Sequence, residues 1–275
     1  MEISTKKCDL HIHSTFSDSD TTVEEIFKLA KSCNISCIAI TDHDTISGIE
    51  QAKYYSKIYG VELIEAIEIS AQKDDFEVHL LGYFIDSKHK LLKEALSNIK
   101  DLRRERLALM IEKLNYIGIN IKKDEVFEKI ADNVPTRLHL ALFLLEKKIV
   151  SSLKDAFRLY LSPGKPAYVA RFKYSVREAI EIIKSCGGLA FLAHPHLFLK
   201  QSWIEEFIVY GLDGLEVMYP RMPQNLIAIY ENMAEKFGLL KSGGSDAHGS
   251  YKEFTKIGEI SIPYSWVEKM KMRLS

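Results

Sequence analysis

Histidines and carboxylates occur in short packets that end predicted strands, and no other feature of the chain limits its fold as strongly. The packets are DLHIHSTFSD, AITDHDT, EAIEIS, VHLLGY, FLAHPH and GGSDAHG, and they supply six of the nine histidines as candidate ligands. A fold that brings these strands together makes one cage from nine side chains: His11, His13, Asp18, His43, Glu68, His79, His194, Asp246 and His248. Repeated imidazoles and carboxylates at strand ends indicate a metal-dependent enzyme.

The spacing within two packets suits chelation. His11 and His13 lie two residues apart, so on a strand both imidazoles point to the same face and can hold one ion. Asp246 and His248 repeat this spacing after the small residues 242–245, which let the backbone turn and approach a neighbour closely. Imidazole and carboxylate donors suit zinc, manganese or iron, and the lack of cysteine in the packets argues against a closed structural zinc site.

Strands and helices alternate on both sides of a central stretch. Periodicity predicts strands at 8–13, 37–41, 61–69, 77–84, 189–193, 214–218 and 239–241, and helices at 22–32, 47–59, 175–185, 203–210 and 225–237. Thr22 and Ser47 are the expected N-caps of the first two helices. This order is typical of βα units around a parallel sheet, and ligands at the carboxyl ends of successive strands predict a barrel with its active site there.

The alternation stops between Lys88 and Ala167. Helical runs are predicted there at 91–107, 137–147 and 155–160, which indicates an insertion rather than further barrel repeats. We therefore expect an α/β fold, a distorted (β/α)7-type barrel formed by residues 1–87 and 168–275. Residues 88–167 are expected to form a helical insertion that covers the active site.

Two segments of the insertion carry groups that suit a phosphate. In VPTRLH, Arg137 and His139 stand at the predicted start of a helix, where unpaired backbone N–H groups favour an anion. In SPGKPAY, Lys165 lies in a turn with Tyr168 nearby. Alternatively, Arg137 and Lys165 are solvated charges and His139 is an interior histidine with satisfied hydrogen bonds. The fit of a guanidinium to phosphate favours the binding interpretation.

Composition limits the partners and the location. At 275 residues with 47% hydrophobic content, the chain can bury a large core. A formal net charge of -1 gives no reason to expect binding to long duplex nucleic acid, so a nucleic-acid substrate is expected to be short or held by a local patch. The four cysteines form no CxxC pair and are expected to be reduced. No signal peptide or bilayer-spanning stretch is recognisable, so we expect a cytoplasmic protein without a membrane partner.

The motifs DLHIHSTFSD, TDHD, IEIS, HLLGY, AHP and GSDAH, in this order, resemble those of the polymerase and histidinol phosphatase (PHP) family. The resemblance implies a distorted barrel that binds two or three divalent ions, of manganese, zinc or iron, and hydrolyses phosphoesters. It implies one ion held by His11, His13, Glu68 and Asp246, a second by Glu68, His79 and His194, and a third by Asp18, His43 and His248. Glu68 bridges the first two ions in this scheme.

One ligand position has two candidates. Where the family usually has a glycine after the aspartate of the first packet, this chain has Ser19 followed by Asp20. Either Asp18 or Asp20 could supply the carboxylate. We favour Asp18 because it keeps the family's spacing from His13.

The insertion resembles one branch of the family. The RLH and GKPAYV segments are similar to the RPH and GKPAYV stretches of the branch that acts on nucleotides, which includes nucleoside 3′,5′-bisphosphate phosphatases and a 5′ to 3′ exonuclease of short RNA. Leu138 replaces the usual proline. The resemblance implies that Arg137 and Lys165 grip a phosphate remote from the scissile one. Tyr168 and Arg171 are expected to line the same pocket.

The expected mechanism is attack on phosphorus by a metal-activated hydroxide. The leaving oxygen then takes a proton from His139 or from water on the third ion, so His248, a ligand of that ion, joins His139 among the expected catalytic residues.

We expect a small phosphorylated substrate, either a nucleoside 3′,5′-bisphosphate or the 5′ end of a short RNA. Two alternatives are a phosphatase of histidinol phosphate or another metabolite, and a noncatalytic metal-bound module of a larger complex. The complete ligand set argues against the noncatalytic module.

Overall fold

A computed structural model of the chain describes residues 6–74, 76–170, 174–197, 201–252 and 254–275. Its contacts divide the chain into two compact units. The first, which we call the barrel unit, comprises Met1–Glu94 and Tyr174–Ser275. The second, the helical unit, is Ala95–Lys173.

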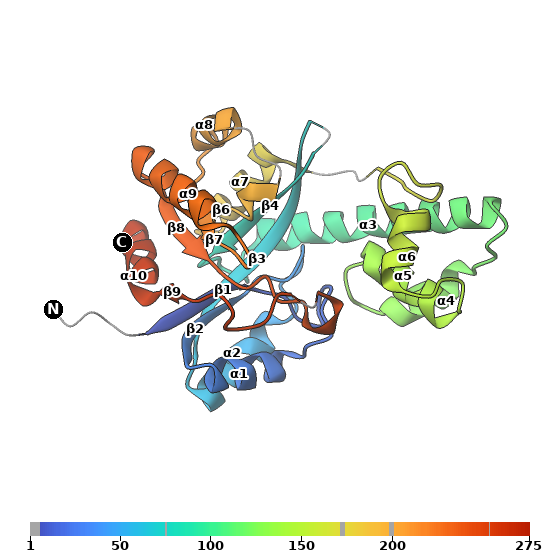
Figure 1. Ribbon diagram of the computed structural model, residues 1–275, viewed down its shortest axis with the longest axis horizontal. Helices are drawn as coiled ribbons and strands as arrows, with labels where there is room; N and C mark the ends of the chain where they lie inside the picture. The colour runs from blue at the N-terminus through green and yellow to red at the C-terminus, as the bar shows by residue number, and fades with distance from the viewer. Residues whose placement is uncertain (1–5, 75, 171–173, 198–200, 253) are drawn as a thin grey trace. The chain divides into compact units, whose positions relative to one another are not determined.

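The barrel unit is built on one twisted sheet (Figure 1). Its strands are β1 (Lys7–Ile12), β2 (Ile35–Ile40), β3 (Glu62–Lys73), β4 (Phe76–Tyr83), β5 (Tyr174–Ser175), β6 (Leu189–Leu192), β7 (Gly214–Met218), β8 (Leu240–Gly243) and β9 (Ile262–Pro263). They follow the order β8-β7-β6-β4-β3-β2-β1-β9, and β5 pairs with β3. After β8 the chain returns to β1, where Asp246 N donates to His11 O at 2.7 Å and His13 N donates to Ala247 O at 3.0 Å. These bonds nearly close the sheet, so the predicted α/β barrel is confirmed.

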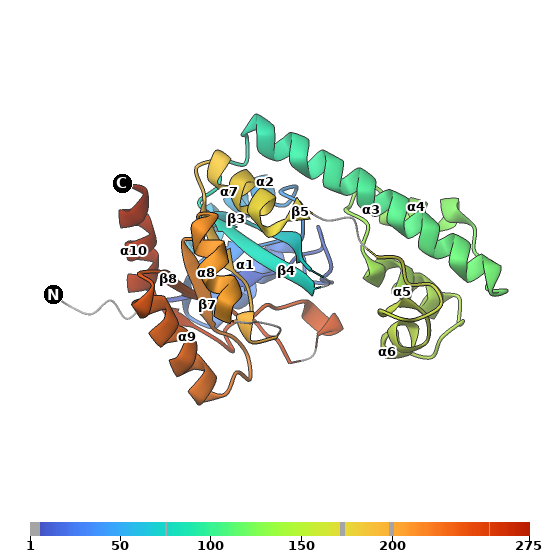
Figure 2. The same cartoon turned by 90° about the horizontal axis from the view of Figure 1, so that it is seen from above.

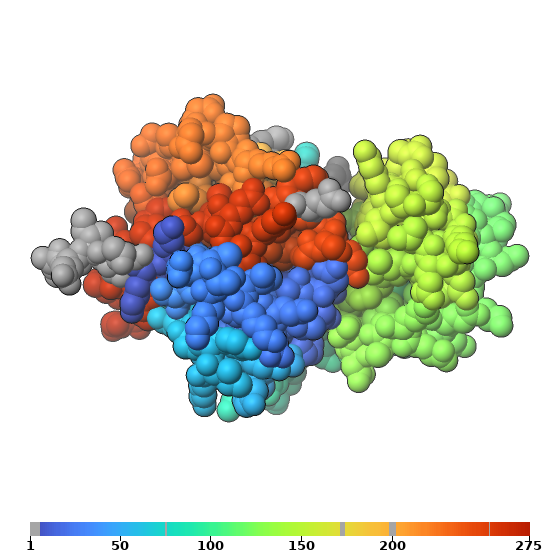
Figure 3. All heavy atoms as spheres, turned by 60° about the horizontal axis from the view of Figure 1, so that its bottom comes forward, coloured from blue at the N-terminus to red at the C-terminus, as the bar shows by residue number. Residues whose placement is uncertain are grey.

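Helices flank this sheet. In the barrel unit they are α1 (Val23–Ser32), α2 (Ile49–Tyr59), α7 (Val176–Ser185), α8 (Gln201–Val209), α9 (Gln224–Lys236) and α10 (Tyr264–Leu274), with 3-10 turns η2 (Pro195–Leu197) and η3 (Gly249–Tyr251). α1 and α2 lie side by side below β2 in Figure 1, and Ile26 and Phe27 of α1 share a buried cluster with Ile12 and Ile38 of the sheet. The two ends of the unit also meet, because β9 pairs antiparallel with β1; Figure 3 shows the blue and red segments in contact.

Of the two predicted N-caps, one is confirmed and one is wrong. The Thr22 hydroxyl accepts from Glu25 N at 3.3 Å, and the Glu25 carboxylate accepts from Thr22 N at 2.8 Å, which makes a capping box for α1. Helix α2 instead has Gly48 as its N-cap, without a side-chain bond. The Ser47 hydroxyl accepts from Thr45 Oγ1 at 3.1 Å in the preceding turn.

The sheet is not wholly parallel as predicted. β4 runs antiparallel to both β3 and β6. Only residues 74 and 75 separate β3 from β4, whereas a crossover to a parallel strand needs about a dozen residues or more. Both strands continue past the candidate ligands, so Glu68 and His79 lie inside strands, and the expectation that every packet ends a strand is wrong for these two residues.

The helical unit packs short helices against one long one (Figure 2). Its elements are α3 (Lys90–Tyr116), of which the part from Ala95 belongs to this unit, α4 (Lys123–Ile130), α5 (Arg137–Glu146), α6 (Leu153–Ala156) and the π-helix η1 (Phe157–Leu161). Met110, Ile111 and Leu114 of α3 share a buried cluster with Val126 and Leu140. α4 was not predicted, because only Val126 and Ile130 of its eight residues are buried and the periodic signal is weak.

Two expectations from composition concern cysteines and membranes. The four cysteines are free thiols, as predicted, with Cys8, Cys37 and Cys186 buried and Cys33 exposed. Within the described ranges, no helix has the length and apolar character needed to cross a membrane.

The glycine that lets the end of β8 approach β1 provides a test of this architecture. A Cβ on Gly244 would overlap the backbone nitrogen of His11 and lie 2.8 Å from Asp9 Oδ1. The close approach predicted for residues 242–245 is therefore confirmed at this position. We expect Gly244→Ala to lower the free energy of unfolding by about 1–3 kcal/mol in urea titrations, as overpacking does, and to weaken manganese binding.

Gly60→Ala is the control for this substitution. Gly60 has a left-handed φ of 67° but nothing within 4 Å of an added Cβ. This variant should lose stability through backbone strain alone and keep its metal affinity. Unchanged manganese affinity in Gly244→Ala would contradict the role given to this contact.

Candidate metal centre

The carboxylate of Glu68 is the centre of the site in the barrel unit. Glu68 is 1% exposed in the interior of β3. Its Oε2 lies 3.5 Å from His11 Nε2, 3.2 Å from His13 Nε2 and 3.0 Å from His43 Nδ1. Its Oε1 lies 3.0 Å from His79 Nδ1 and 3.3 Å from His194 Nε2. One carboxylate thus faces imidazoles on both of its oxygens, as a ligand that bridges two ions must.

Three groups of donor atoms surround this carboxylate, each with its atoms within 4.8 Å of one another. They are His11, His13 and Asp246; His43, Glu68 and His79; and His13, Asp18, His43 and His248. The first and third contain the ligands that the family resemblance implied for the first and third ions, apart from Glu68. The second has His43 where the resemblance implied His194, which lies 3.3 Å from Glu68 Oε1, the oxygen that His79 also faces.

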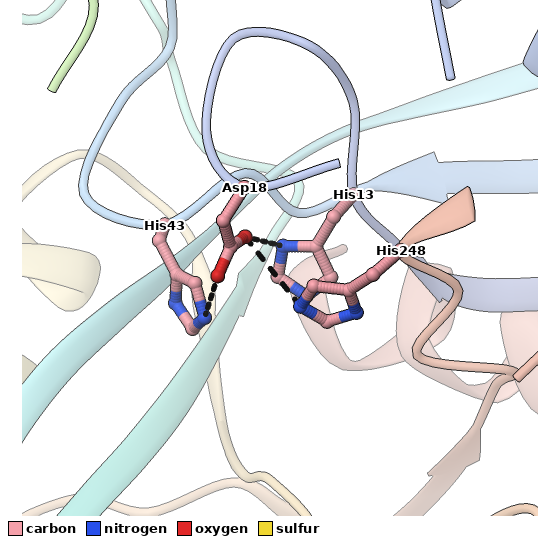
Figure 4. A group of neighbouring side chains, drawn as sticks. All are labelled: His13, Asp18, His43 and His248. Atoms are coloured by element: carbon pink, nitrogen blue, oxygen red, sulfur yellow. Dashed lines mark ion pairs between the residues drawn. The ribbon is translucent and has the colours of Figure 1, made fainter. Parts of the chain in front are cut away.

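Asp18, rather than Asp20, lies among the imidazoles. Figure 4 shows the Asp18 carboxylate between His43 on one side and His13 and His248 on the other; its oxygens are 3.6 Å, 3.6 Å and 3.4 Å from the nearest ring nitrogens of these three histidines. Asp20 instead accepts a hydrogen bond from Ser250 N at 2.8 Å. The geometry therefore favours Asp18 as the first-packet ligand.

The donor atoms fit divalent ions. Several are buried and, apart from the imidazole–carboxylate contacts given above, have no hydrogen-bond partner among the residues that the structure describes: His11 Nε2, both ring nitrogens of His13, Asp18 Oδ1, His43 Nδ1, Glu68 Oε2 and His79 Nδ1. Buried polar atoms are rarely left without a partner, and a cation between imidazole and carboxylate donors supplies one. Burial opposes ionisation of Glu68, but His43, His79 and His11 hold the pKa of this carboxyl well below its usual range. The carboxylate therefore stays charged and available as a ligand.

The loops that carry these donors are held by other buried carboxylates. Asp42 accepts from Ser14 N at 2.7 Å and from Ser17 Oγ at 2.6 Å, which holds the turn between His13 and Asp18. Asp44 accepts from Ser70 N at 2.8 Å, two residues beyond Glu68. The chain thus uses the two aspartates around His43 to position neighbouring segments of the site.

Two candidate ligand residues have strained backbones. His194 has φ 28° and Asp246 has φ 49°, values that non-glycine residues seldom adopt. Such strain persists only where the surrounding structure holds it, and it is concentrated at functional sites. Two hydrogen bonds provide that support: Asp246 N donates to His11 O, and His194 N donates to the Glu216 carboxylate.

Sequence reasoning missed Glu216, which contacts two candidate ligands. This fully buried residue of β7 places Oε1 2.9 Å from His11 Nδ1 and accepts from His194 N with Oε2 at 2.6 Å. A carboxylate on the far nitrogen of a ligand imidazole fixes its orientation and raises its basicity. The signal was present in GLEVM, where one acidic residue interrupts an otherwise apolar strand.

Tyr219 and Lys252 were also missed. The Tyr219 hydroxyl donates to Asp246 Oδ2 at 2.6 Å, and Lys252 Nζ contacts the same oxygen and donates to the Tyr219 hydroxyl at 2.9 Å. Asp246 Oδ1 meanwhile lies 3.3 Å from His11 Nε2 and 3.1 Å from His13 Nε2. Asp246 Oδ1 therefore faces the imidazoles, whereas Tyr219 and Lys252 hold Oδ2. No local pattern marks Tyr219 or Lys252 in the sequence.

The residues expected to bind substrate belong to the helical unit. Arg137 begins α5, with its guanidinium 5.9 Å from the Phe157 ring centre. His139 Nδ1 accepts from Thr136 N at 3.1 Å and so closes the capping box of that helix. Lys165 is exposed, in a turn where Tyr168 N donates to Lys165 O at 2.9 Å. Arg171, the remaining candidate, lies outside the described residues.

Replacing Glu216 tests whether its carboxylate positions His11 and His194 for metal binding. In Glu216→Gln the amide NH2 cannot accept a hydrogen bond, so either His11 or His194 loses its partner while the side chain keeps its size. We expect manganese affinity, measured by calorimetric titration, to fall about 10- to 100-fold with the fold retained. Glu231→Gln, on the outer helix α9, is the control and should bind metal normally. Equal affinities in the two variants would refute the role of Glu216.

A barrel that gathers imidazoles and carboxylates around one buried glutamate places this protein among the metal-dependent enzymes. Residues 9–185 match the PHP domain family. The chain belongs to the PHP family, as its motifs predicted.

Several similar proteins match most of this chain. The 5'-3' exoribonuclease of Haemophilus influenzae is 34% identical over 269 residues, 96% of this chain and 93% of that protein. The 3',5'-nucleoside bisphosphate phosphatase of Chromobacterium violaceum is 31% identical over 247 residues, 87% of this chain and 86% of that protein. A crystal structure from Bifidobacterium adolescentis, assigned as a metal-dependent phosphoesterase, superposes with a TM-score of 0.89 at 28% identity, covering 99% and 98% of the two chains.

Proposed function

We propose that this protein is a metal-dependent phosphoesterase that hydrolyses phosphate esters of small nucleotides, either a nucleoside 3′,5′-bisphosphate or the 5′ end of a short RNA. The observation that carries the proposal is the set of three donor groups around Glu68. The two relatives support the substrate class, since both names describe hydrolysis of nucleotide phosphoesters and both matches cover most of each chain. A cytoplasmic location fits such substrates.

The donor set suits two or three ions of manganese, zinc or iron. When bound, such ions stabilise charge on phosphoryl oxygens and lower the pKa of water, so that no serine or cysteine nucleophile is required. The protein supplies anionic ligands that do not titrate near neutral pH. Burial opposes the charge on Asp246, but His11 and His248 hold the pKa of its carboxyl well below the usual range.

We propose that the leaving oxygen takes its proton from His139 or from water on an ion that His248 would help to hold. Because His139 Nδ1 accepts the N–H of Thr136, the neutral ring carries its hydrogen on Nε2. That nitrogen can donate to a phosphate oxygen or to the leaving group. His248 Nδ1 lies 2.8 Å from the carbonyl oxygen of Asp246, which turns His248 Nε2 toward Asp18 and the third donor group.

Two other functions are less well supported. A phosphatase of histidinol phosphate or another metabolite would not need the RLH and GKPAYV segments. A noncatalytic module would not need a complete donor set, and the two relatives are matched over 93% and 86% of their own lengths rather than as part of a large complex.

A hydrolysis screen with manganese tests the proposal, and it measures phosphate released from the monoesters and phosphate or 5′-nucleotide released from the RNA. The substrates are adenosine 3′,5′-bisphosphate, a 5′-phosphorylated pentanucleotide RNA and histidinol phosphate. We expect release from the two nucleotide substrates, and a loss of at least about 100-fold in kcat for Asp246→Ala, because an ion then lacks a ligand. Tyr54→Ala, an exposed substitution on α2, is the control. Release that persists in metal-depleted protein, or only from histidinol phosphate, would overturn the proposal.

The specificity for two phosphates is proposed to depend on Arg137 and Lys165. If Arg137 holds the phosphate that is not cleaved, Arg137→Ala should lower kcat/KM for a nucleoside 3′,5′-bisphosphate. The loss should correspond to about 1.5–3 kcal/mol of binding free energy, the value of a charge-assisted hydrogen bond. An aryl monophosphate should be hydrolysed nearly as before. Lys165→Ala should behave in the same way.

Arg158→Ala is the matched control for charge. Arg158 is exposed in the same unit and pairs with Asp155 at 2.8 Å. Its loss should leave the ratio of the two kcat/KM values unchanged. Equal losses on both substrates in Arg137→Ala would show that Arg137 supports the fold rather than a remote phosphate.

A further inference from the structure

The two units of the chain carry opposite charges. The formal net charge of -1 is the sum of unequal parts. The helical unit has sixteen Lys and Arg against nine Asp and Glu, a net of +7, and the barrel unit has twenty-one against twenty-nine, a net of -8. Divalent ions would offset part of the negative charge of the barrel unit. The positive charge of the helical unit has no such explanation, and it is the kind of field that attracts a polyanion.

One groove in the helical unit combines this field with exposed aromatic and apolar side chains. It lies between the last turns of α3 and the segment 166–170 and has a volume of about 650 Å³, within the range of roughly 300–1,000 Å³ for ligand sites. Leu109, Tyr116 and Ile117 line it from α3, and Pro166 and Tyr168 line it from the other side. Tyr116 is 92% exposed, although large rings are normally covered.

Cations hold the second wall of the groove. Lys113 Nζ donates to Tyr168 O at 2.7 Å, and Arg106 Nε donates to Val169 O at 2.9 Å with its guanidinium 5.8 Å from the Tyr168 ring centre. The acidic lining residue Glu112 is paired with Lys123 at 2.5 Å. The groove therefore offers rings and apolar surface in a locally positive environment.

The same wall continues into the segment proposed to bind phosphate. Lys165 directly precedes Pro166. Tyr168 N donates a hydrogen bond to Lys165 O, so residues 165–168 form one turn. A nucleotide chain whose phosphate is near Lys165 would have its neighbouring base within reach of this groove.

We propose that this groove binds a base of single-stranded RNA, downstream of the phosphate that is removed, with Tyr116 as the stacking ring. The inference rests on the proposed function and deepens it, because it assigns a binding site to a further base of a short RNA. Stacking on an aromatic ring together with a positive groove is how proteins hold single strands without reading sequence. Every base has a face that can stack, so the site is expected to accept any base.

Binding of an RNA that resists hydrolysis tests this inference apart from catalysis. The probe is a fluorescein-labelled pentanucleotide oligoadenylate with phosphorothioate linkages, and the Kd is measured by fluorescence anisotropy with the full-length, manganese-loaded protein. Tyr116→Ala should raise the Kd about 5- to 150-fold, the effect of losing one stacked base. Tyr116→Phe keeps the ring and should stay within about twofold of wild type, since stacking does not need the hydroxyl. The wild-type Kd should rise with added salt.

Tyr54→Ala is the matched control, because Tyr54 is also an exposed tyrosine, 61% accessible, but lies on α2 of the negative barrel unit. It should not change the Kd. Hydrolysis of adenosine 3′,5′-bisphosphate is measured in parallel and should be unaffected by Tyr116→Ala, because that substrate has no downstream base.

The outcomes separate the two proposals. Failure of wild type to bind the probe, or a Kd for Tyr116→Ala within about twofold of wild type, overturns the groove while the proposed function stands if the bisphosphate is still hydrolysed. Binding that depends on Tyr116 in a protein that hydrolyses neither nucleotide supports the groove and overturns the proposed function.

Discussion

The burial of one negative charge, that of Glu68, is the constraint on which the rest of the barrel unit depends. A carboxylate that is 1% exposed has lost the hydration that would stabilise it, which costs several kcal/mol unless cations or donors replace water. Imidazoles from four separated segments, at residues 11–13, 43, 79 and 194, converge on this group. Neutral imidazoles and carboxylates share their lone pairs with divalent ions, so the charge of Glu68 is balanced best when the site is loaded with metal.

Convergence of these segments requires that the sheet nearly close. β1 supplies His11 and the loop beyond β8 supplies Asp246, and the two backbones meet through the bond from Asp246 N to His11 O. Asp9, buried below them, accepts from Ser245 N at 2.8 Å and from Gly258 N at 3.3 Å, which ties the same loop to a later segment. The metal centre and the closure of the barrel are thus one structural feature, so damage to the closure also damages the ligand set.

The sequence predicted what local chemistry determines and missed what depends on long-range contact. Candidate ligands such as His11 and His13 were predicted because their spacing places both imidazoles on one face of a strand. Glu216 was missed because its role arises from contact with His11, 205 positions away in sequence. The antiparallel β4 was missed although its signal was local: two aspartates, 74 and 75, leave no room for a crossover. Tyr219 and Lys252 had no signal at all, since a tyrosine and a lysine fit many surfaces.

The separation of charge between the units gives each a distinct physical task. The barrel unit, at -8, is suited to concentrating divalent cations, and without them it would repel a phosphate. The helical unit, at +7, is suited to attracting the same phosphate from solution. A single fold of uniform charge could not favour both ligands at once. Carrying the two charges on separate units lets one chain concentrate both the metal ions and the anionic substrate that those ions are proposed to act upon.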